Sequence, residues 1–328
     1  MAKRELPWRQ TRDPYTIWVS EIILQQTRVE QGTPYFERFI EAFPNAESLA
    51  NAPEDKVLAL WQGLGYYSRA RNMQAAAKEI MANYDGRFPQ TYEEILKLKG
   101  IGPYTAAAIS SICYDQPEPV VDGNVFRAAS RIFGIHEDIS KGSTRKLFVS
   151  TLKEIIPSDL PGTFNQAMME LGATICKPSP NCADCPVRDH CYAFGKKITD
   201  QLPVKGKKTK VRDRYLNYLV YQSAGKVLMK KRDEKDIWYG LYDFPMIEGK
   251  EVDIENLETK KNVSADYIHI LSHQRLHARF FLFEPDEDEM ADLARTYNAK
   301  PYSLKQMLTL PKPKLVVNYL EDTPDLAE

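Results

Sequence analysis

Four of the five cysteines lie within one stretch of sixteen residues, CKPSPNCADCPVRDHC. They are Cys176, Cys182, Cys185 and Cys191, spaced as C-x5-C-x2-C-x5-C. In a reducing cytosol, clustered cysteines more often bind a metal or do redox chemistry than form disulfides. Four thiolates can hold zinc or a [4Fe–4S] cluster, so the ligand count predicts a metal site without choosing between the two.

Two carboxylic acids stand in surroundings that could give them a chemical role. Glu21 lies in an expected helix whose residues 17–19 and 22–24 are apolar, and burial among such side chains raises a carboxyl pKa. A structural glutamate paired with an arginine is the alternative. Asp122 precedes an apolar-periodic helix, where it is either an N-cap or a functional carboxylate. By themselves, these residue types favour the structural interpretation of both side chains.

A third candidate is the stretch LKGIGPYTAAAI at residues 98–109, in which Gly100 and Gly102 lie between two expected helices. Pro103 is suited to the first position of the second helix. Unpaired amide N–H groups at such a helix start bind anions, including a DNA phosphate. A tight turn that needs glycine only for its positive φ is an equally good interpretation.

The elements that must position these groups differ along the chain. Residues 13–175 have helical apolar spacing, and Asp13 and Pro14 mark the start of the first helix. Further helices are predicted over 34–42, 54–60, 68–83, 91–97, 103–112, 123–132, 143–155 and 163–175. Later the apolar period becomes two, which predicts strands over 215–222, 227–232 and 277–284 and then a helix over 287–296.

Length and charge limit the classes of protein to consider. The 328 residues suit two domains of roughly 100 to 200 residues each. The formal net charge of -1 gives no overall signal for nucleic-acid binding, so such binding would need local basic patches. Residues 205–214, KGKKTKVRDR, carry six basic residues against one acid and are predicted to be a linker that could also contact phosphates. No stretch approaches the roughly 18 apolar residues of a membrane span, which predicts a cytosolic protein.

Taken together, the motifs resemble those of MutY-type adenine DNA glycosylases. SEIILQQTRV, LWQGLGYYSRARN, LKGIGPYTAAAI, VVDGNVFR and MMELGATIC occur in that family's order and approximate spacing. The resemblance implies a mostly α helix-hairpin-helix glycosylase domain at 1–204, a basic linker at 205–214 and an α+β Nudix-like 8-oxoguanine recognition domain at 215–328. It also implies a [4Fe–4S] cluster in the loop 176–191, with zinc as the lesser alternative, although the first cysteine spacing is one residue shorter than the family's.

The resemblance also assigns chemistry. Glu21 would protonate N7 of an adenine mispaired with 8-oxoguanine or guanine, and Asp122, assisted by Asn124, would stabilise the sugar cation and position water. Tyr104 stands where strand-nicking relatives carry a Schiff-base lysine, which implies base removal with little or no lyase activity. A bifunctional endonuclease III-like glycosylase-lyase for oxidised pyrimidines is the second hypothesis, and a non-enzymatic DNA-binding protein with a redox cluster is the third.

Contacts with DNA are implied at several further positions, because the target base must be flipped out of the duplex. The residues that match the adenine pocket are Trp8, Arg9 and Glu170. The residues that match DNA contacts of the helical part are Gln26, Thr27, Tyr66, Gly100 and Gly102. Ser272 and His273 match the loop that contacts 8-oxoguanine, although Leu271 stands where that loop usually has phenylalanine.

The C-terminal part lacks the carboxylates of a Nudix hydrolase. Met246 stands where the magnesium-binding box has its first glutamate, and no Arg-Glu-x2-Glu-Glu follows. A reader of 8-oxoguanine is therefore expected in place of a hydrolase. The expected partner is double-stranded DNA with adenine opposite 8-oxoguanine, bound by a monomer in the bacterial cytoplasm, at the nucleoid and away from any membrane. The sequence identifies no protein partner.

Overall fold

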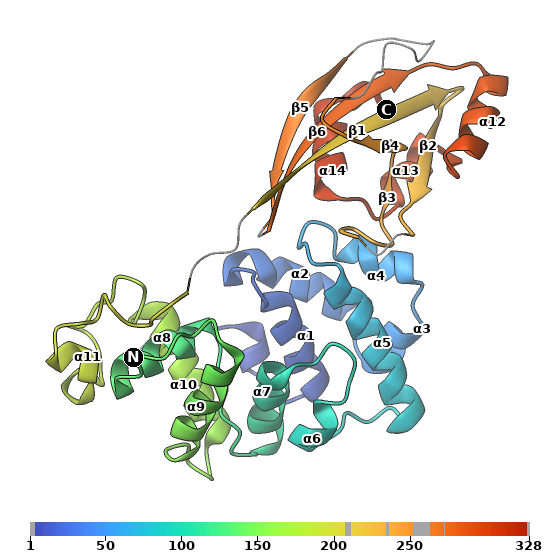
Figure 1. The fold of residues 1–328 in the computed structure, drawn as a ribbon. Helices are drawn as coiled ribbons and strands as arrows, with labels where there is room; N and C mark the ends of the chain where they lie inside the picture. The colour runs from blue at the N-terminus through green and yellow to red at the C-terminus, as the bar shows by residue number, and fades with distance from the viewer. Residues whose placement is uncertain (1–3, 207–210, 234–235, 252–262, 272, 327–328) are drawn as a thin grey trace. The chain divides into compact units, whose positions relative to one another are not determined.

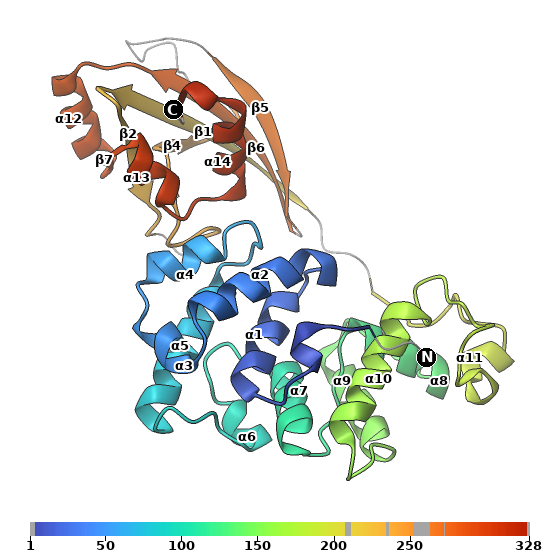
Figure 2. The same ribbon diagram turned by 180° about the vertical axis from the view of Figure 1, so that it is seen from behind.

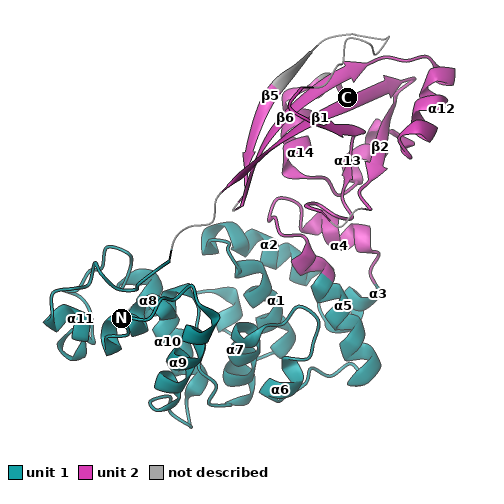
Figure 3. Cartoon of the chain, in the orientation of Figure 1, with its two compact units in different colours: residues 1–51, 72–207 teal, residues 52–71, 208–328 magenta. Residues whose placement is uncertain are grey.

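The computed structural model describes residues 4–206, 211–233, 236–251, 263–271 and 273–326. The chain divides by packing into two compact units, each built from two stretches of sequence (Figure 3). We call residues 1–51 and 72–207 the helical unit, and residues 52–71 and 208–328 the sheet unit. The segment 52–71 therefore packs with C-terminal residues, although its sequence pattern continues that of the preceding helices.

Helices dominate the helical unit, as predicted (Figure 1). Their bounds are η1 Pro7–Arg9, α1 Pro14–Leu24, α2 Val29–Ala42, α3 Ala46–Asn51, α5 Ser68–Asn83, α6 Tyr92–Ile95, α7 Pro103–Tyr114, α8 Gly123–Phe133, α9 Gly142–Lys153, α10 Pro161–Thr174, η2 Arg188–His190 and α11 Tyr192–Gly195. Helix α1 packs against α2 and α7, and α8 packs against α10. The first four residues of α5 belong to the sheet unit.

The predicted helix boundaries are confirmed to within two residues for most of these helices. Asp13 caps α1 as predicted, because its Oδ2 accepts a hydrogen bond from the backbone N–H of Thr16 at 2.8 Å. The predicted start of α2 at residue 34 is wrong, since the helix begins at Val29 and contains Pro34. Burial of Phe36 and Phe39 on this helix offsets the one internal hydrogen bond that a proline removes.

The sheet unit contains a seven-stranded sheet in the order β3-β2-β1-β6-β5, with β4 paired to β1 and β7 paired to β2 (Figure 2). The strands are β1 Arg212–Ser223, β2 Lys226–Lys231, β3 Tyr242–Asp243, β4 Met246–Glu248, β5 Val263–Ile270, β6 Gln274–Phe283 and β7 Lys300–Ser303. The helices are α4 Glu54–Leu60, α12 Glu287–Thr296, α13 Leu304–Thr309, α14 Lys314–Asp322 and η3 Pro324–Leu326. Strand β1 runs parallel to β6, and the other strand pairs among the described residues are antiparallel.

The three predicted strands are confirmed, but β1 begins at Arg212, within the predicted linker at 205–214. Residues 207–210 of that linker lie outside the described residues. Side chains of β1 alternate between two cores, as the pleat requires. Tyr218 and Phe280 face α14, where Phe280 stacks on Tyr319 with ring centroids 4.0 Å apart. Leu219 and Phe283 face the other side and pack with Met290 of α12. The α+β prediction is thus confirmed.

None of the helices in the described part of the chain has both the length and the apolar character that crossing a membrane would require.

Candidate active site and cysteine loop

Glu21 is buried in α1, with 8% of its surface exposed. The Tyr104 hydroxyl donates a hydrogen bond of 2.6 Å to Glu21 Oε2, and it also lies 3.6 Å from Met169 Sδ. Burial raises the pKa of Glu21 to about 7, with a further increase from the charge of Asp122 and opposing effects from Tyr104 and Arg9. Glu21 can therefore hold a proton near neutral pH, which is what a general acid needs. The predicted burial of this side chain is confirmed.

Asp122 is the N-cap of α8, and its two carboxyl oxygens have different partners. Oδ1 accepts a hydrogen bond from the Val125 backbone N–H at 2.7 Å, and Oδ2 accepts one from Asn124 Nδ2 at 2.9 Å. Burial raises the pKa of Asp122, while both hydrogen bonds act in the opposite direction because they stabilise the carboxylate. The capping interpretation is correct, and it leaves the carboxylate near enough to Glu21 to raise the pKa of that group.

Glu170, near the end of α10, is buried and ion-paired with two arginines. Its Oε2 accepts hydrogen bonds from Arg9 at 2.6 Å and from Arg4 at 2.8 Å, and its Oε1 accepts one from Arg4 at 2.7 Å. Burial acts to raise the pKa of Glu170, but the hydrogen bonds from Arg4 and Arg9 outweigh it and the pKa is lowered. Trp8 of η1 is also buried, edge-to-face with Phe36 at 5.2 Å.

The turn between α6 and α7 separates the roles of its two glycines. Gly100 has φ of +76°, and a Cβ there would lie 2.5 Å from Asn72 Cβ, so glycine is required for the fold. Gly102 has φ of -100°, caps α7 without a side-chain hydrogen bond, and a Cβ there would meet open space. Among the described residues, no acceptor is found for the amide N–H groups of Gly102, Tyr104 and Thr105. Gly100 is thus needed for its positive φ, whereas the amide N–H groups that begin at Gly102 are available to an anion.

Replacing these two glycines by alanine should produce different defects. We expect Gly100→Ala to lower the free energy of unfolding by about 1–3 kcal/mol, because the left-handed backbone and the contact with Asn72 both oppose a side chain. Gly102→Ala should cost about 1 kcal/mol or less, yet weaken binding to DNA because the methyl group shields the free amides. Urea unfolding and equilibrium binding to a duplex measure both effects. Equal stability of the two variants would contradict this assignment.

Two of the predicted DNA contacts, Gln26 and Tyr66, share an uncommon backbone conformation. Gln26, directly after α1 in the helical unit, has φ of 57° and is exposed, and Thr27 follows it. Tyr66, in the sheet unit, has φ of 48° and is 44% exposed. Positive φ is uncommon for residues other than glycine and is retained mainly where the surroundings enforce it, often at functional sites. His273 is exposed between β5 and β6 and lines a cavity together with Tyr66, whereas Ser272 lies outside the described residues.

The four clustered cysteines line one cavity after α10. Among the described residues, no group of three or more His, Cys, Asp or Glu side chains has the arrangement of a metal-ion site. The buried guanidinium of Arg131 lies at the same place. It donates hydrogen bonds of 3.4 Å to Cys176 Sγ and 2.6 Å to the carbonyl oxygen of Lys177. Arg131 therefore joins α8 to the cysteine loop through side-chain hydrogen bonds.

A second arginine of α8 links the cysteine loop to the residues around Asp122. Arg127 donates to the carbonyl oxygen of Cys176 at 2.7 Å and to Asn124 Oδ1 at 2.9 Å. Arg127 and Arg131 were not predicted as site residues, although their spacing of four on a predicted helix after Asp122 places them on one face. Arg4 was also missed, because a basic residue near the start of the chain carries no local signal of burial.

Comparisons with known proteins agree with this arrangement. Residues 19–154 match the HhH-GPD superfamily of base excision DNA repair proteins, and residues 217–322 match the NUDIX domain. The adenine DNA glycosylase of Buchnera aphidicola subsp. Acyrthosiphon pisum (strain APS) is 37% identical over 283 residues, which cover 84% of this chain and 81% of that protein. The adenine DNA glycosylase of Schizosaccharomyces pombe (strain 972 / ATCC 24843) is 32% identical over 368 residues, covering 87% and 80%. The structure of a thermostable thymine-DNA glycosylase matches with a TM-score of 0.54 and 28% identity, covering 59% of this chain and 89% of that one.

The helical unit and its buried carboxylates thus define a helix-hairpin-helix glycosylase of base excision DNA repair, joined to a Nudix-type unit. Identity at this level over most of both chains is more specific than the shared fold. The chain belongs to the adenine DNA glycosylase family.

Proposed function

We propose that this protein hydrolyses the N-glycosidic bond of adenine mispaired with 8-oxoguanine or guanine in double-stranded DNA, leaving an abasic site. The observation that carries the proposal is the buried Glu21, whose pKa of about 7 and hydrogen bond to Tyr104 suit a general acid beside a second carboxylate. The names of the relatives support adenine as the excised base. The protein acts on DNA in the cytoplasm, as a monomer.

The order of the chemistry follows from the two carboxyl groups. An adenine that has been flipped out of the duplex enters beside Trp8, Arg9 and Glu170. Glu21 gives its proton to N7, so that the base leaves as a neutral molecule. Positive charge then develops on the deoxyribose, and Asp122, held by Asn124 and the start of α8, stabilises that charge and directs water to the sugar carbon.

Tyr104 supports base removal without strand cleavage. A lyase step needs an amine to form a Schiff base with the sugar, and a phenol cannot supply one. Burial and the neighbouring charge of Glu21 raise the pKa of Tyr104 well above its usual value, so the hydroxyl stays protonated as a hydrogen-bond donor. Tyr104 therefore orients Glu21, and the glycosylase-lyase alternative is disfavoured.

The sheet unit would read the partner base. Tyr66 and His273 line the same cavity of this unit, and Ser272 adjoins His273 in sequence. Met246 on β4 occupies the position of the first box glutamate and cannot bind magnesium, which leaves recognition as the role of the fold. The predicted division into a domain at 1–204, a linker at 205–214 and a domain at 215–328 belongs to this proposal.

The donor set of the cysteine loop suits an iron–sulfur cluster. Cys176, Cys182, Cys185 and Cys191 line one cavity, and in a [4Fe–4S] cluster each thiolate binds a different iron. Membership of the adenine DNA glycosylase family favours the cluster over zinc. When bound, the cluster would hold the loop and Arg131 in place, and the glycosylase chemistry would be carried by residues of the helical unit alone.

A duplex with one central adenine·8-oxoguanine pair tests the proposal. After incubation with the protein, hot alkali should cleave the adenine strand at that position, and little cleavage should occur before alkali. An adenine·guanine duplex should be cut as well, and a matched thymine·adenine duplex should stay intact. Intact adenine strands after alkali would reject the function, and strong cleavage before alkali would favour the glycosylase-lyase.

A further inference from the structure

A cavity of about 460 Å³ lies within the sheet unit and combines residues far apart in the sequence. One part of its lining comes from the turn and helix start at 63–71, and the other comes from residues 236–238, 269–271, His273 and Lys314. Binding sites for small ligands and cofactors usually enclose about 300–1,000 Å³. The cavity is therefore large enough for a nucleobase with its sugar.

Aromatic rings from both parts of the lining face this cavity. Tyr66 comes from the turn, and Trp238, His269 and His273 come from the C-terminal segments. The ring centroids of Trp238 and His269 lie 6.0 Å apart with their planes tilted by 60°. Burial lowers the pKa of His269, so its imidazole is neutral at neutral pH and behaves as an aromatic ring. Such surfaces bind nucleobases of any sequence by stacking.

The backbone at Trp238 is in an unfavourable conformation that its surroundings enforce. Its φ of 64° lies in the left-handed region, which bulky residues rarely adopt. Two hydrogen bonds close the loop around it, from Gly240 N to Arg232 O and from Arg232 N to Leu241 O, each at 2.8 Å. Strain that is held in place by surrounding bonds is found mainly at ligand-binding and catalytic positions.

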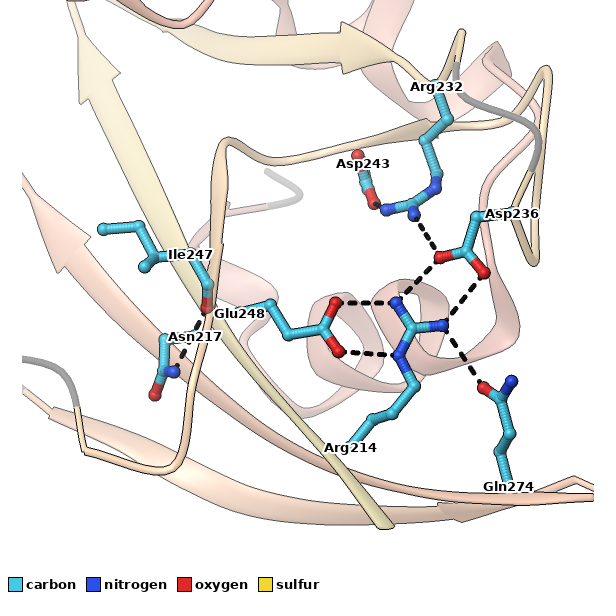
Figure 4. A network of polar contacts seen from close by, with 8 residues as sticks. All are labelled: Arg214, Asn217, Arg232, Asp236, Asp243, Ile247, Glu248 and Gln274. Atoms are coloured by element: carbon cyan, nitrogen blue, oxygen red, sulfur yellow. Dashed lines mark hydrogen bonds and ion pairs between the residues drawn. The ribbon is translucent and has the colours of Figure 1, made fainter. Parts of the chain in front are cut away.

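An ion-pair network holds a residue that is close to Trp238 in the sequence (Figure 4). Asp236, two residues before Trp238, accepts hydrogen bonds from Arg214 at 2.9 and 2.8 Å and from Arg232 at 3.4 Å. Arg214 is held in turn by both carboxyl oxygens of Glu248, at 2.8 and 2.7 Å. These bonds hold the side chain of Asp236 in place, two residues before Trp238.

The charges at the cavity suit a nucleotide better than an apolar peptide. Arg71 and Lys314 contribute cationic groups to its lining, and Lys314 is also ion-paired with Glu321 at 3.3 Å. Asp236 is an acidic residue of the lining, and it is ion-paired with Arg214 and Arg232, which also pair with Glu248 and Asp243. Aromatic rings combined with lysine and arginine are the usual surface for a base and its phosphodiester.

We propose that Trp238 is a base-contacting residue, which stacks on a nucleobase of the strand opposite the excised adenine within the cavity that Tyr66 and His273 also line. The inference rests on the proposed function and adds to it a binding determinant in the segment 236–238. The preferred ligand is a purine nucleotide within duplex DNA, with 8-oxoguanine as the partner base of the mispair.

Binding measurements in a non-cleaving background test this role. In Glu21→Gln protein, Trp238→Leu should weaken binding to an adenine·8-oxoguanine duplex by about tenfold, and binding to a matched duplex should change much less. Trp238→Phe should restore most of the affinity. Ile268→Ala is the matched control, because Ile268 is an exposed apolar side chain of β5 that does not line this cavity, and its affinity should equal that of the parent.

Tryptophan fluorescence gives an independent readout of stacking. The chain has four tryptophans, of which Trp8, Trp18 and Trp61 are buried and Trp238 is partly exposed. Adding the adenine·8-oxoguanine duplex should quench fluorescence in the parent protein, and Trp238→Phe should reduce that quenching and leave the contribution of Trp8, which lies beside the flipped adenine.

The outcomes separate this inference from the proposed function. Unchanged affinity and unchanged quenching in the Trp238 variants would overturn the inference alone, provided that the parent protein with Glu21 intact excises adenine. A parent protein with Glu21 intact that leaves the adenine·8-oxoguanine duplex uncut would overturn the proposed function instead.

Discussion

Replacing Glu21 with glutamine is expected to abolish adenine excision while leaving DNA binding intact. Glutamine keeps the size of the side chain and can still accept the hydrogen bond from Tyr104, but it has no acidic proton to transfer to N7. General acid catalysis contributes about 10²–10⁴-fold to a rate, so single-turnover excision should fall by at least that factor. Excision in this variant at more than about a tenth of the parent rate would contradict the role of Glu21 as the acid.

The pH profile gives a second measure of the same group. With its pKa raised to about 7, Glu21 is protonated below that pH and loses its proton above it. Single-turnover excision by the parent should therefore decline as pH rises through about 7, by about tenfold per pH unit at the alkaline end. The residual rate of Glu21→Gln should not show this decline. A parent rate that increases from pH 6 to pH 9 would show that another group supplies the proton.

The same substitution should make the protein more stable. The unfolded chain releases the Glu21 proton near 4.5, whereas the folded protein holds it until about 7. The buried, protonated Glu21 contributes fully to the free energy of unfolding below about pH 4.5, and this contribution is lost as pH rises through about 7. The full loss is about 3 kcal/mol. Since glutamine does not ionise, Glu21→Gln should unfold at higher urea concentration than the parent at pH 8. The two proteins should differ little at pH 4.

Local patterns explain which parts of the site could be predicted from the sequence. The cysteine spacing, the two glycines before Pro103 and the apolar neighbours of Glu21 are all contained in short stretches. Each stretch forms one turn or one helix, so its chemistry is visible without knowledge of the fold. The family's motif order then related these stretches to one another, and the helical and α+β assignments were confirmed.

Contacts between distant stretches could not be predicted in this way. Arg4 and Glu170 are 166 residues apart, and neither has a neighbour that indicates burial or pairing. Residues 52–71 read as helix and turn, yet the pattern gives no indication that they pack against strands of the sheet unit. Trp238 sits in a short irregular segment that is joined to β1 and β4 by ion pairs, and such contacts are apparent only in three dimensions.

Replacing Asp122 with asparagine should reduce excision by about a hundredfold or more while changing stability little. Asparagine caps a helix nearly as well as aspartate, so the hydrogen bond from the Val125 N–H should persist. The charge that opposes the developing sugar cation is lost, and removing one preorganised electrostatic group usually costs about 10²–10³-fold in rate. The Asn124 amide would also lose one of its two possible acceptors, because the side chain at position 122 would have one oxygen in place of two.

Asp13 offers a matched control for this experiment, because it caps α1 with the same geometry. Its Oδ2 accepts from the Thr16 N–H at 2.8 Å, and it is an exposed residue at the start of the helix that carries Glu21. Asp13→Asn should match Asp122→Asn in its small effect on urea unfolding and should keep near-parent excision rates. If both variants lost activity to the same extent, the role of Asp122 would be that of a helix cap alone. If only Asp122→Asn loses excision activity and still binds an adenine·8-oxoguanine duplex, the loss measures the electrostatic contribution of Asp122. Both residues cap a helix, but only Asp122 lies near the general acid Glu21.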